Sequence, residues 1–180
     1  MSGTVSVTEF WNPLQVTDHE TCSLGWLYQR MKGEVDGFNL NLDPDYQRGH
    51  VWTDAQAEAF IGHLIEGGSV PPIIINSCWQ DGGVDEVLDG KQRITAVIRW
   101  FDGEIKAELT DGRRLAFTDL DAEAQRYMSA MTGPRFDLNY VNLDRAGVLR
   151  LYLRLNRGGT VHTDAEINRV RELLVAEETA

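Results

Sequence analysis

The chain has 180 residues, of which 42% are apolar and 25% are charged, and its formal net charge is −11. This composition is that of a globular domain large enough to bury a core, and the acidic balance argues against a protein that coats nucleic acid non-specifically. No apolar run reaches the roughly 18 residues that cross a bilayer, and the N-terminus lacks the basic and apolar segments of a secretory signal, so we expect a cytoplasmic protein that does not enter a membrane.

Apolar spacing and turn residues predict helices and strands in alternation along the chain. In chain order we expect a helix at 22–31, a strand entering a loop at 36–52, a helix from 53 to a Gly-Gly end at 67–68, strands at 70–76 and 84–88, a helix at 90–101, a hairpin at 109–117, a helix at 121–131, a strand at 135–143, and helices at 144–157 and from 163 onward. Thr53 and Thr163 are the expected N-caps of their helices, and Glu166 completes a capping box with Thr163.

Strands that are joined both as a hairpin and through helices indicate an α+β fold with a small mixed sheet surrounded by helices. The chain has no internal repeat, low-complexity tract or linker rich in serine and proline, so we expect residues 1–180 to form a single domain. Cys22 and Cys78 lie far apart in the sequence and form no metal-ligand pair, so we expect two buried, reduced thiols.

The sequence Asp89-Gly90-Lys91-Gln92-Arg93 joins an expected strand to an expected helix. The first turn of a helix has free backbone N–H groups, which together with the helix dipole favour an anion. Gly90 allows a ligand to approach the backbone closely, and Arg93 can hold a phosphate with two hydrogen bonds. Asp89 has three interpretations: it caps the helix, it holds Mg²⁺ shared with phosphates, or it acts as a general base toward a hydroxyl or water.

Two further segments carry candidate binding residues. Aromatic and basic side chains alternate in PDYQRGHVW at 44–52, which suits a nucleotide base or sugar, although Tyr46 and Trp52 can equally pack inward from a surface loop. The expected helix at 144–157 has Val148, Leu151, Tyr152 and Leu155 on one face and Arg150, Arg154 and Arg157 on the other, where charges usually form a solvated surface. The residues that follow, NRGGT at 156–160, can form a phosphate-binding nest of backbone N–H groups or a glycine C-cap.

Three segments together resemble a known family. In order, PDYQRGHVWTDAQAEAFIGHLIEGGSVPPIII, VLDGKQRITAVIRWF and LYLRLNRGGTVHTDAEI resemble the N-terminal domain of GmrSD-type modification-dependent restriction proteins, which belongs to the ParB/sulfiredoxin superfamily. The resemblance covers about residues 43–172, which makes residues 1–40 an N-terminal extension with a short helix. Within it, Gly90, Arg93 and Ala96 resemble the phosphate-binding turn that ParB and sulfiredoxin share.

The resemblance implies a ParB/sulfiredoxin-like fold with a nucleotide pocket, and nucleoside triphosphate hydrolysis occurs in several members. By motif it implies pocket roles for Gln47 and Arg48, phosphate-binding or catalytic roles for Asp89, Gly90, Gln92 and Arg93, and a third motif at Asn156, Gly158 and Gly159. The family commonly has glutamine where this chain has Lys91, which adds a cation beside the phosphates. We expect Arg48, Arg93 and the turn at 156–159 to meet around one pocket.

The resemblance therefore predicts a nucleotide-binding domain that hydrolyses a nucleoside triphosphate with Mg²⁺, with Asp89 as the candidate metal ligand, in a bacterial phage-defence protein or a phage-encoded one. One alternative is a phosphotransferase that acts on a nucleotide or DNA hydroxyl. Another is a non-catalytic module that binds DNA through a local arginine patch, or binds a partner protein. The family's restriction proteins also carry an HNH-like nuclease domain, which this sequence lacks, so we expect no autonomous restriction activity.

Overall fold

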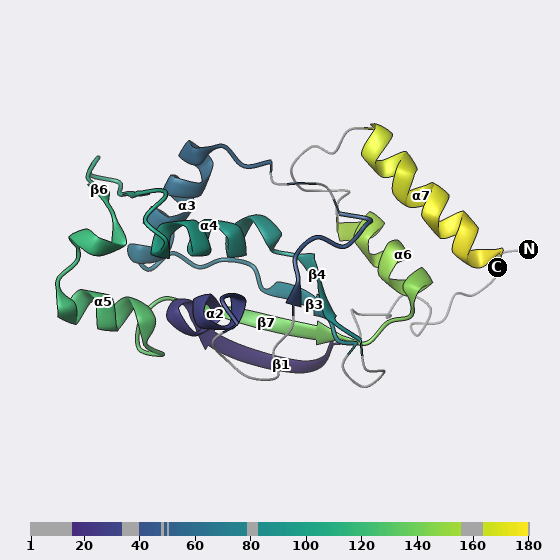
Figure 1. The fold of residues 1–180 in the computed structure, drawn as a ribbon, viewed down its shortest axis with the longest axis horizontal. Helices are drawn as coiled ribbons and strands as arrows, with labels where there is room; N and C mark the ends of the chain where they lie inside the picture. The colour runs from purple at the N-terminus through teal and green to yellow at the C-terminus, as the bar shows by residue number, and fades with distance from the viewer. Residues whose placement is uncertain are drawn as a thin grey trace, which may run out of the picture.

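A five-stranded mixed sheet organises the fold (Figure 1). The computed structural model describes residues 16–33, 40–47, 49, 51–78, 83–155 and 164–179. The strands of this sheet are β1 (Val16–Ser23), β2 (Leu40–Asn41), β3 (Ile73–Asn76), β4 (Asp85–Asp89) and β7 (Arg135–Val141), in the order β1-β7-β3-β4-β2. A separate antiparallel pair, β5 (Ala107–Glu108) and β6 (Arg114–Leu115), forms the predicted hairpin.

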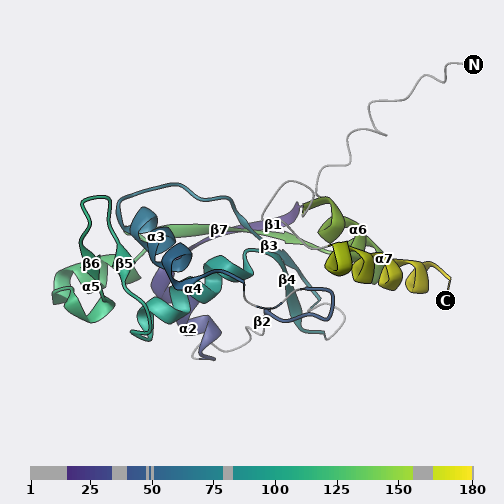
Figure 2. The same ribbon diagram turned by 90° about the horizontal axis from the view of Figure 1, so that it is seen from above.

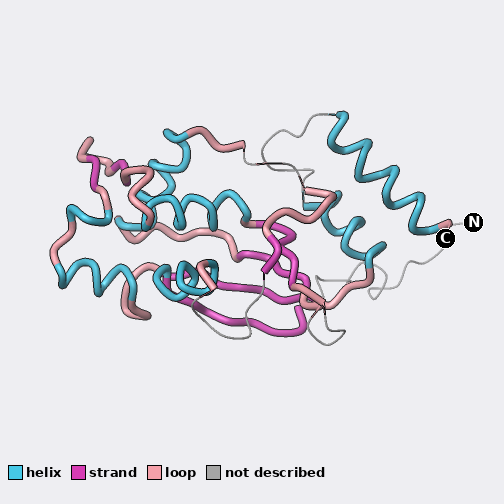
Figure 3. Tube along the Cα trace, in the orientation of Figure 1, coloured by secondary structure: helices cyan, strands magenta, loops and turns pink. Residues whose placement is uncertain are grey.

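Antiparallel and parallel pairings alternate across the main sheet. The β1–β7 and β3–β4 pairs are antiparallel, whereas the β3–β7 and β2–β4 pairs are parallel. Parallel neighbours require long crossover connections, and helices occupy these connections here (Figure 3). The mixed sheet confirms the predicted α+β class.

The helices of the described residues are α2 (Leu24–Met31), α3 (Asp54–Ile65), α4 (Lys91–Phe101), α5 (Ala122–Ser129), α6 (Arg145–Leu155) and α7 (Asp164–Glu178), with a short 3₁₀ helix at Phe117–Asp119. Figure 2 shows α6 and α7 together at the end of the molecule opposite α5. None of the described helices is long and apolar enough to cross a membrane.

Strand β3 separates two hydrophobic clusters, because successive side chains of a strand point to opposite faces of the sheet. Ile73 and Ile75 are fully buried in the larger cluster, with Trp100 from α4 and apolar side chains from α2 and α3. Ile74 points the other way and packs in the smaller cluster with Leu149 from α6. The sheet is therefore covered on both faces at its centre.

Several local features follow from the sequence. Thr53 caps α3 as predicted, and Gln56 completes a capping box with it that was not predicted. Gly62, in the middle of α3, allows the hairpin to lie directly against the helix, because a Cβ atom there would lie 1.7 Å from the carbonyl oxygen of Glu108 in β5. Glu58 is nearly buried in the same contact, where it accepts a hydrogen bond from Arg114.

Most predicted elements are present with ends shifted by a few residues, but β1 was not predicted. Cys22 and Ser23 end β1 rather than begin a helix, and Ser23 caps α2 by accepting a hydrogen bond from the backbone N–H of Trp26. Residues 16–31 of the predicted N-terminal extension thus form the edge strand of the sheet and its first helix. The predicted cap at Thr163 lies outside the described residues.

Candidate functional site

The turn between β4 and α4 has the predicted form of a strand that leads directly into a helix. Gly90 is the N-cap of α4 and has a φ of 110°, a left-handed value that favours glycine. A Cβ atom at this position would also lie 2.8 Å from Cγ1 of Ile73. Backbone conformation and packing therefore both require glycine here, whether or not a ligand approaches.

Arg93 lies in the first turn of α4, and its side chain is only 10% exposed. Its guanidinium donates hydrogen bonds to the carbonyl oxygens of Pro71 and Pro72 and to Oδ2 of Asp89, the last at 2.7 Å. Burial lowers the pKa of Arg93 from its usual value, and the neighbouring Asp89 carboxylate partly counteracts this. Arg93 therefore ties the turn to the segment that leads into β3, and its contact with phosphate stays a prediction.

Asp89 does not cap α4, so that interpretation is wrong. Gly90 occupies the N-cap position, and the Asp89 carboxylate instead pairs with Arg93 across the turn through Oδ2. The Asp89 side chain is 49% exposed, and Oδ1 has no hydrogen bond among the described residues. One carboxylate oxygen thus remains available toward solvent, which fits a shared Mg²⁺ or a proton acceptor. Among the described residues, no group of three potential metal ligands is present.

Lys91 is the second cation of this turn, and its side chain is 9% exposed. Its ammonium pairs with Asp43, whose side chain is 78% exposed. Both buried cations of the turn therefore have carboxylate partners that lie largely or partly in solvent.

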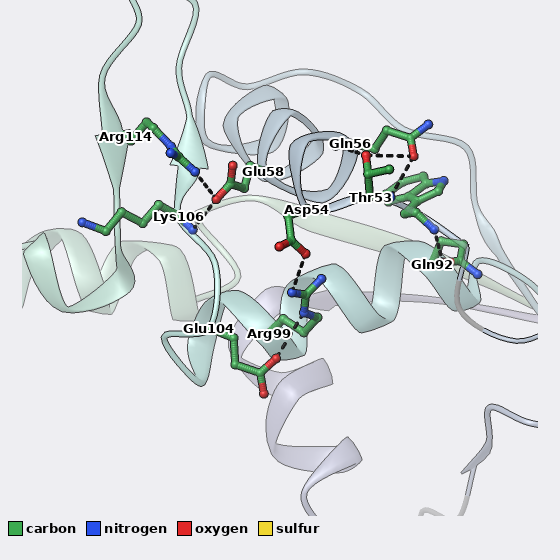
Figure 4. Close-up of polar contacts among 10 residues, drawn as sticks. Thr53, Asp54, Gln56, Glu58, Gln92, Arg99, Glu104, Lys106 and Arg114 are labelled. Carbon is green, nitrogen blue, oxygen red and sulfur yellow. Dashed lines mark hydrogen bonds and ion pairs between the residues drawn. The ribbon is translucent and has the colours of Figure 1, made fainter.

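The loop before α3 is held over this turn by two glutamines. Gln47 donates a hydrogen bond from Nε2 to the carbonyl oxygen of Val87 in β4. Oε1 of Gln92 accepts hydrogen bonds from the backbone N–H groups of Val51 and Trp52, at 3.2 and 3.3 Å. Figure 4 shows Gln92 next to the beginning of α3. Gln47 thus bonds to β4 two residues before Asp89, and Gln92 bonds the same loop to the first turn of α4.

The aromatic side chains of the same loop pack inward. Tyr46 is 3% exposed and donates a hydrogen bond to Glu86, and it meets Tyr152 of α6 edge-on. Trp52 packs against Phe60 in the larger cluster. Inward packing is therefore confirmed for both side chains, completely for Tyr46 and in part for Trp52. Arg48 and His50 lie outside the described residues.

The predicted third cluster is described only in part. Val148 and Tyr152 are buried on one face of α6, and the opposite face exposes Arg150 and Arg154, with Arg150 paired to Glu178 of α7. The predicted motif at Asn156, Gly158 and Gly159 lies outside the described residues, so its convergence with Arg48 and Arg93 stays a prediction.

Asp43, Pro71 and Pro72 were not predicted as part of this site. Asp43 is 48 residues from Lys91, and Pro71 is 22 residues from Arg93, so only the tertiary fold brings them together. Their sequence signals are those of a loop before proline and a chain entering a strand, which indicate local backbone shape and not a partner.

A comparison with protein-family models agrees with the motif pattern. A family model described as "GmrSD restriction endonuclease, N-terminal domain" matches residues 29–171. A solved structure of the C-terminally truncated chromosome-partitioning protein ParB from Caulobacter crescentus, complexed with CTP-γ-S, is 14% identical with a TM-score of 0.41. That similarity covers 90% of this chain and 65% of the ParB chain. No curated protein matches. Because the family model spans most of the sequence, the chain belongs to the GmrSD restriction endonuclease N-terminal domain family.

Proposed function

We propose that this domain binds a nucleoside triphosphate at the turn between β4 and α4 and hydrolyses it with Mg²⁺, as part of a restriction or phage-defence system. The observation that carries the proposal is the nearly buried Lys91 in the first turn of α4, in a chain of this family. A cation and the N-terminus of a helix both favour phosphate at the same place.

The binding step requires an exchange of counter-ions. Asp43 is mostly exposed, so it can leave Lys91 at small cost when a phosphate takes its place. The loop that contains Asp43 also contributes Gln47, whose bond to β4 keeps the loop beside the turn. Phosphate binding is therefore local and does not require the core to rearrange.

Asp89 supplies the acid–base or metal-binding group of the proposal. Its Oδ2 is fixed by Arg93, and we propose that Oδ1, which has no hydrogen bond among the described residues, faces the phosphate. When bound, Mg²⁺ would neutralise phosphate charge and orient the reacting phosphoryl group. Arg93 positions Asp89 and keeps a positive charge close to the start of the helix.

The test is a thermal-shift panel of the four nucleoside triphosphates with and without Mg²⁺, followed by calorimetry and a phosphate-release assay. Lys91→Met should weaken binding by about 1.5–3 kcal/mol, because a charge-assisted contact is lost. Lys32→Met is the matched control, since Lys32 pairs with Asp102 as Lys91 pairs with Asp43 but belongs to α2's C-terminal end. Equal nucleotide affinities of Lys91→Met and Lys32→Met would contradict the proposed site at the start of α4.

The assay also separates the alternatives. Phosphate release without an added acceptor supports hydrolysis, whereas phosphate transferred only to a supplied hydroxyl supports a phosphotransferase. Absence of nucleotide binding by the intact chain would favour a DNA-binding or partner-binding module.

A further inference from the structure

A cavity of about 630 Å³ lies away from the turn between β4 and α4. It is lined by residues 20–23 of β1, by four residues of α2, by Phe101 and Phe117, and by residues 129–131 at the C-terminal end of α5. This volume lies within the range of roughly 300–1,000 Å³ that is typical of small-molecule sites. None of its lining residues belongs to the proposed nucleotide site.

Aromatic rings form much of the cavity wall. Tyr28 stacks on Phe101 with ring centroids 4.8 Å apart, and Phe101 meets Phe117 at 4.5 Å. Trp26 also lines the cavity and is held in place by the Arg30 guanidinium, which lies 3.0 Å from its ring centroid. The rings support one another, so the wall is in place before a ligand arrives.

Glu20 places one fixed acceptor in this aromatic setting. Its Oε2 accepts hydrogen bonds from Arg30 at 3.1 Å and from Tyr140 at 3.0 Å, which fix the orientation of the carboxylate. Its Oε1 has no hydrogen bond among the described residues. Among the lining residues Glu20 alone is an acid, and none is a lysine, arginine or histidine. The lining therefore favours a ligand that donates hydrogen bonds over one that carries negative charge.

We propose that this cavity binds a flat, ring-containing molecule whose amino, amidino or guanidino group donates a hydrogen bond to Oε1 of Glu20. The rings of Trp26, Tyr28, Phe101 and Phe117 would contact the flat part of the ligand, and Glu20 would select for the N–H group. The proposal is independent of the proposed nucleotide site.

The test uses benzamidine as the probe and benzoate as its counterpart of opposite charge, with the full chain in calorimetry and in NMR titration of the Trp26 indole signal. Benzamidine should bind and shift that signal, and benzoate should not. Glu20→Gln should weaken benzamidine binding roughly tenfold or more, since a charge-assisted hydrogen bond is lost. Asp18→Asn is the control, because Asp18 lies exposed on the same strand outside the cavity.

A second variant keeps the test decisive if Glu20→Gln disturbs its contacts with Arg30 and Tyr140. Gln29 is exposed on α2 and lines the cavity, so Gln29→Arg adds a positive charge there without touching the core. It should weaken benzamidine binding and allow benzoate to bind. The proposal would be overturned if Gln29→Arg left the affinity for benzamidine unchanged. It would also be overturned if the unaltered chain bound benzamidine no more tightly than benzoate.

Discussion

The Asp89 carboxylate and the Arg93 guanidinium lie 2.7 Å apart across the start of α4, with the acid partly exposed and the cation nearly buried. The Arg93 guanidinium also donates hydrogen bonds to the carbonyl groups of Pro71 and Pro72, so these contacts fix the position of the pair. Loss of the acid and loss of the cation should therefore have different consequences.

Asp89→Asn should abolish phosphate release while nucleotide binding survives or strengthens. The substitution removes a negative charge near the phosphates and also removes the proposed metal ligand or base. Phosphate release and calorimetry measure the two effects separately. Asp85→Asn, on the same strand, is the control. Unchanged hydrolysis in Asp89→Asn would remove Asp89 from the mechanism.

Arg93→Ala should lower both nucleotide affinity and stability. We expect nucleotide binding to weaken by about 1.5–3 kcal/mol, because a positive charge close to the start of α4 is lost. The free energy of unfolding should fall by a similar amount, because the carbonyl groups of Pro71 and Pro72 lose a buried charged donor. Arg99→Ala should lower stability by at most about 1 kcal/mol, since its partners Asp54 and Glu104 are mostly exposed. Urea unfolding measures the difference, and equal losses would show that the proline contacts do not stabilise the fold.

Gly90→Ala should be strongly destabilising for two separable reasons. A left-handed backbone costs an alanine about 1–2 kcal/mol, and contact with Ile73 adds about 1–3 kcal/mol. Gly103→Ala, at the other end of α4, isolates the first cost, because Gly103 has a φ of 78° and no atom within 4 Å of an added Cβ. Thermal unfolding of both variants tests this, and similar melting temperatures would argue against the packing contribution.

Cys22 should be unreactive in the folded protein. Its thiol is 1% exposed, and burial, aided by the charge of Glu20, raises its pKa from 9.0 to about 12. At pH 8 a disulfide reagent should therefore label Cys78, which is partly exposed, and label Cys22 only after unfolding. Fast labelling of Cys22 in a folded Cys78→Ser variant would contradict this prediction.

The same pKa shift predicts that the free energy of unfolding falls at alkaline pH. The raised pKa means that the folded state holds the thiol proton more tightly, so this contribution is complete below pH 9 and is lost as the pH rises from 9 toward 12. Cys22→Ala should reduce the loss of stability in that window, as measured by urea unfolding at several pH values.

Local patterns predicted most of the fold because they depend on neighbouring residues. The apolar stripe of α4, the N-cap at Thr53 and the turn at Gly90 each occur within a short stretch. Strand β1 was not predicted because its first four residues, from Val16 to His19, are exposed. The sequence there shows little of the alternation of apolar and polar residues that indicates a half-buried strand.

Of the candidate site, the sequence predicted only the form of the turn, which lies within one short segment. Residues 89–93 form the turn as expected, but the partners of Lys91 and Arg93 come from distant loops. An isolated charge pattern indicates that a cation is present and does not identify the group it meets. Tyr46 shows the same limit, because its burial depends on Tyr152, far along the chain.

The position of β3 between the two hydrophobic clusters has a consequence for hydrogen exchange. All four of its residues are buried, and it pairs with β4 on one side and β7 on the other. Any opening that frees its amides must disrupt both clusters at once, whereas α6 and α7 can separate by disrupting only the smaller one. The amides of β3 should therefore exchange with solvent only through complete unfolding, and their exchange rates would report the global stability of the domain.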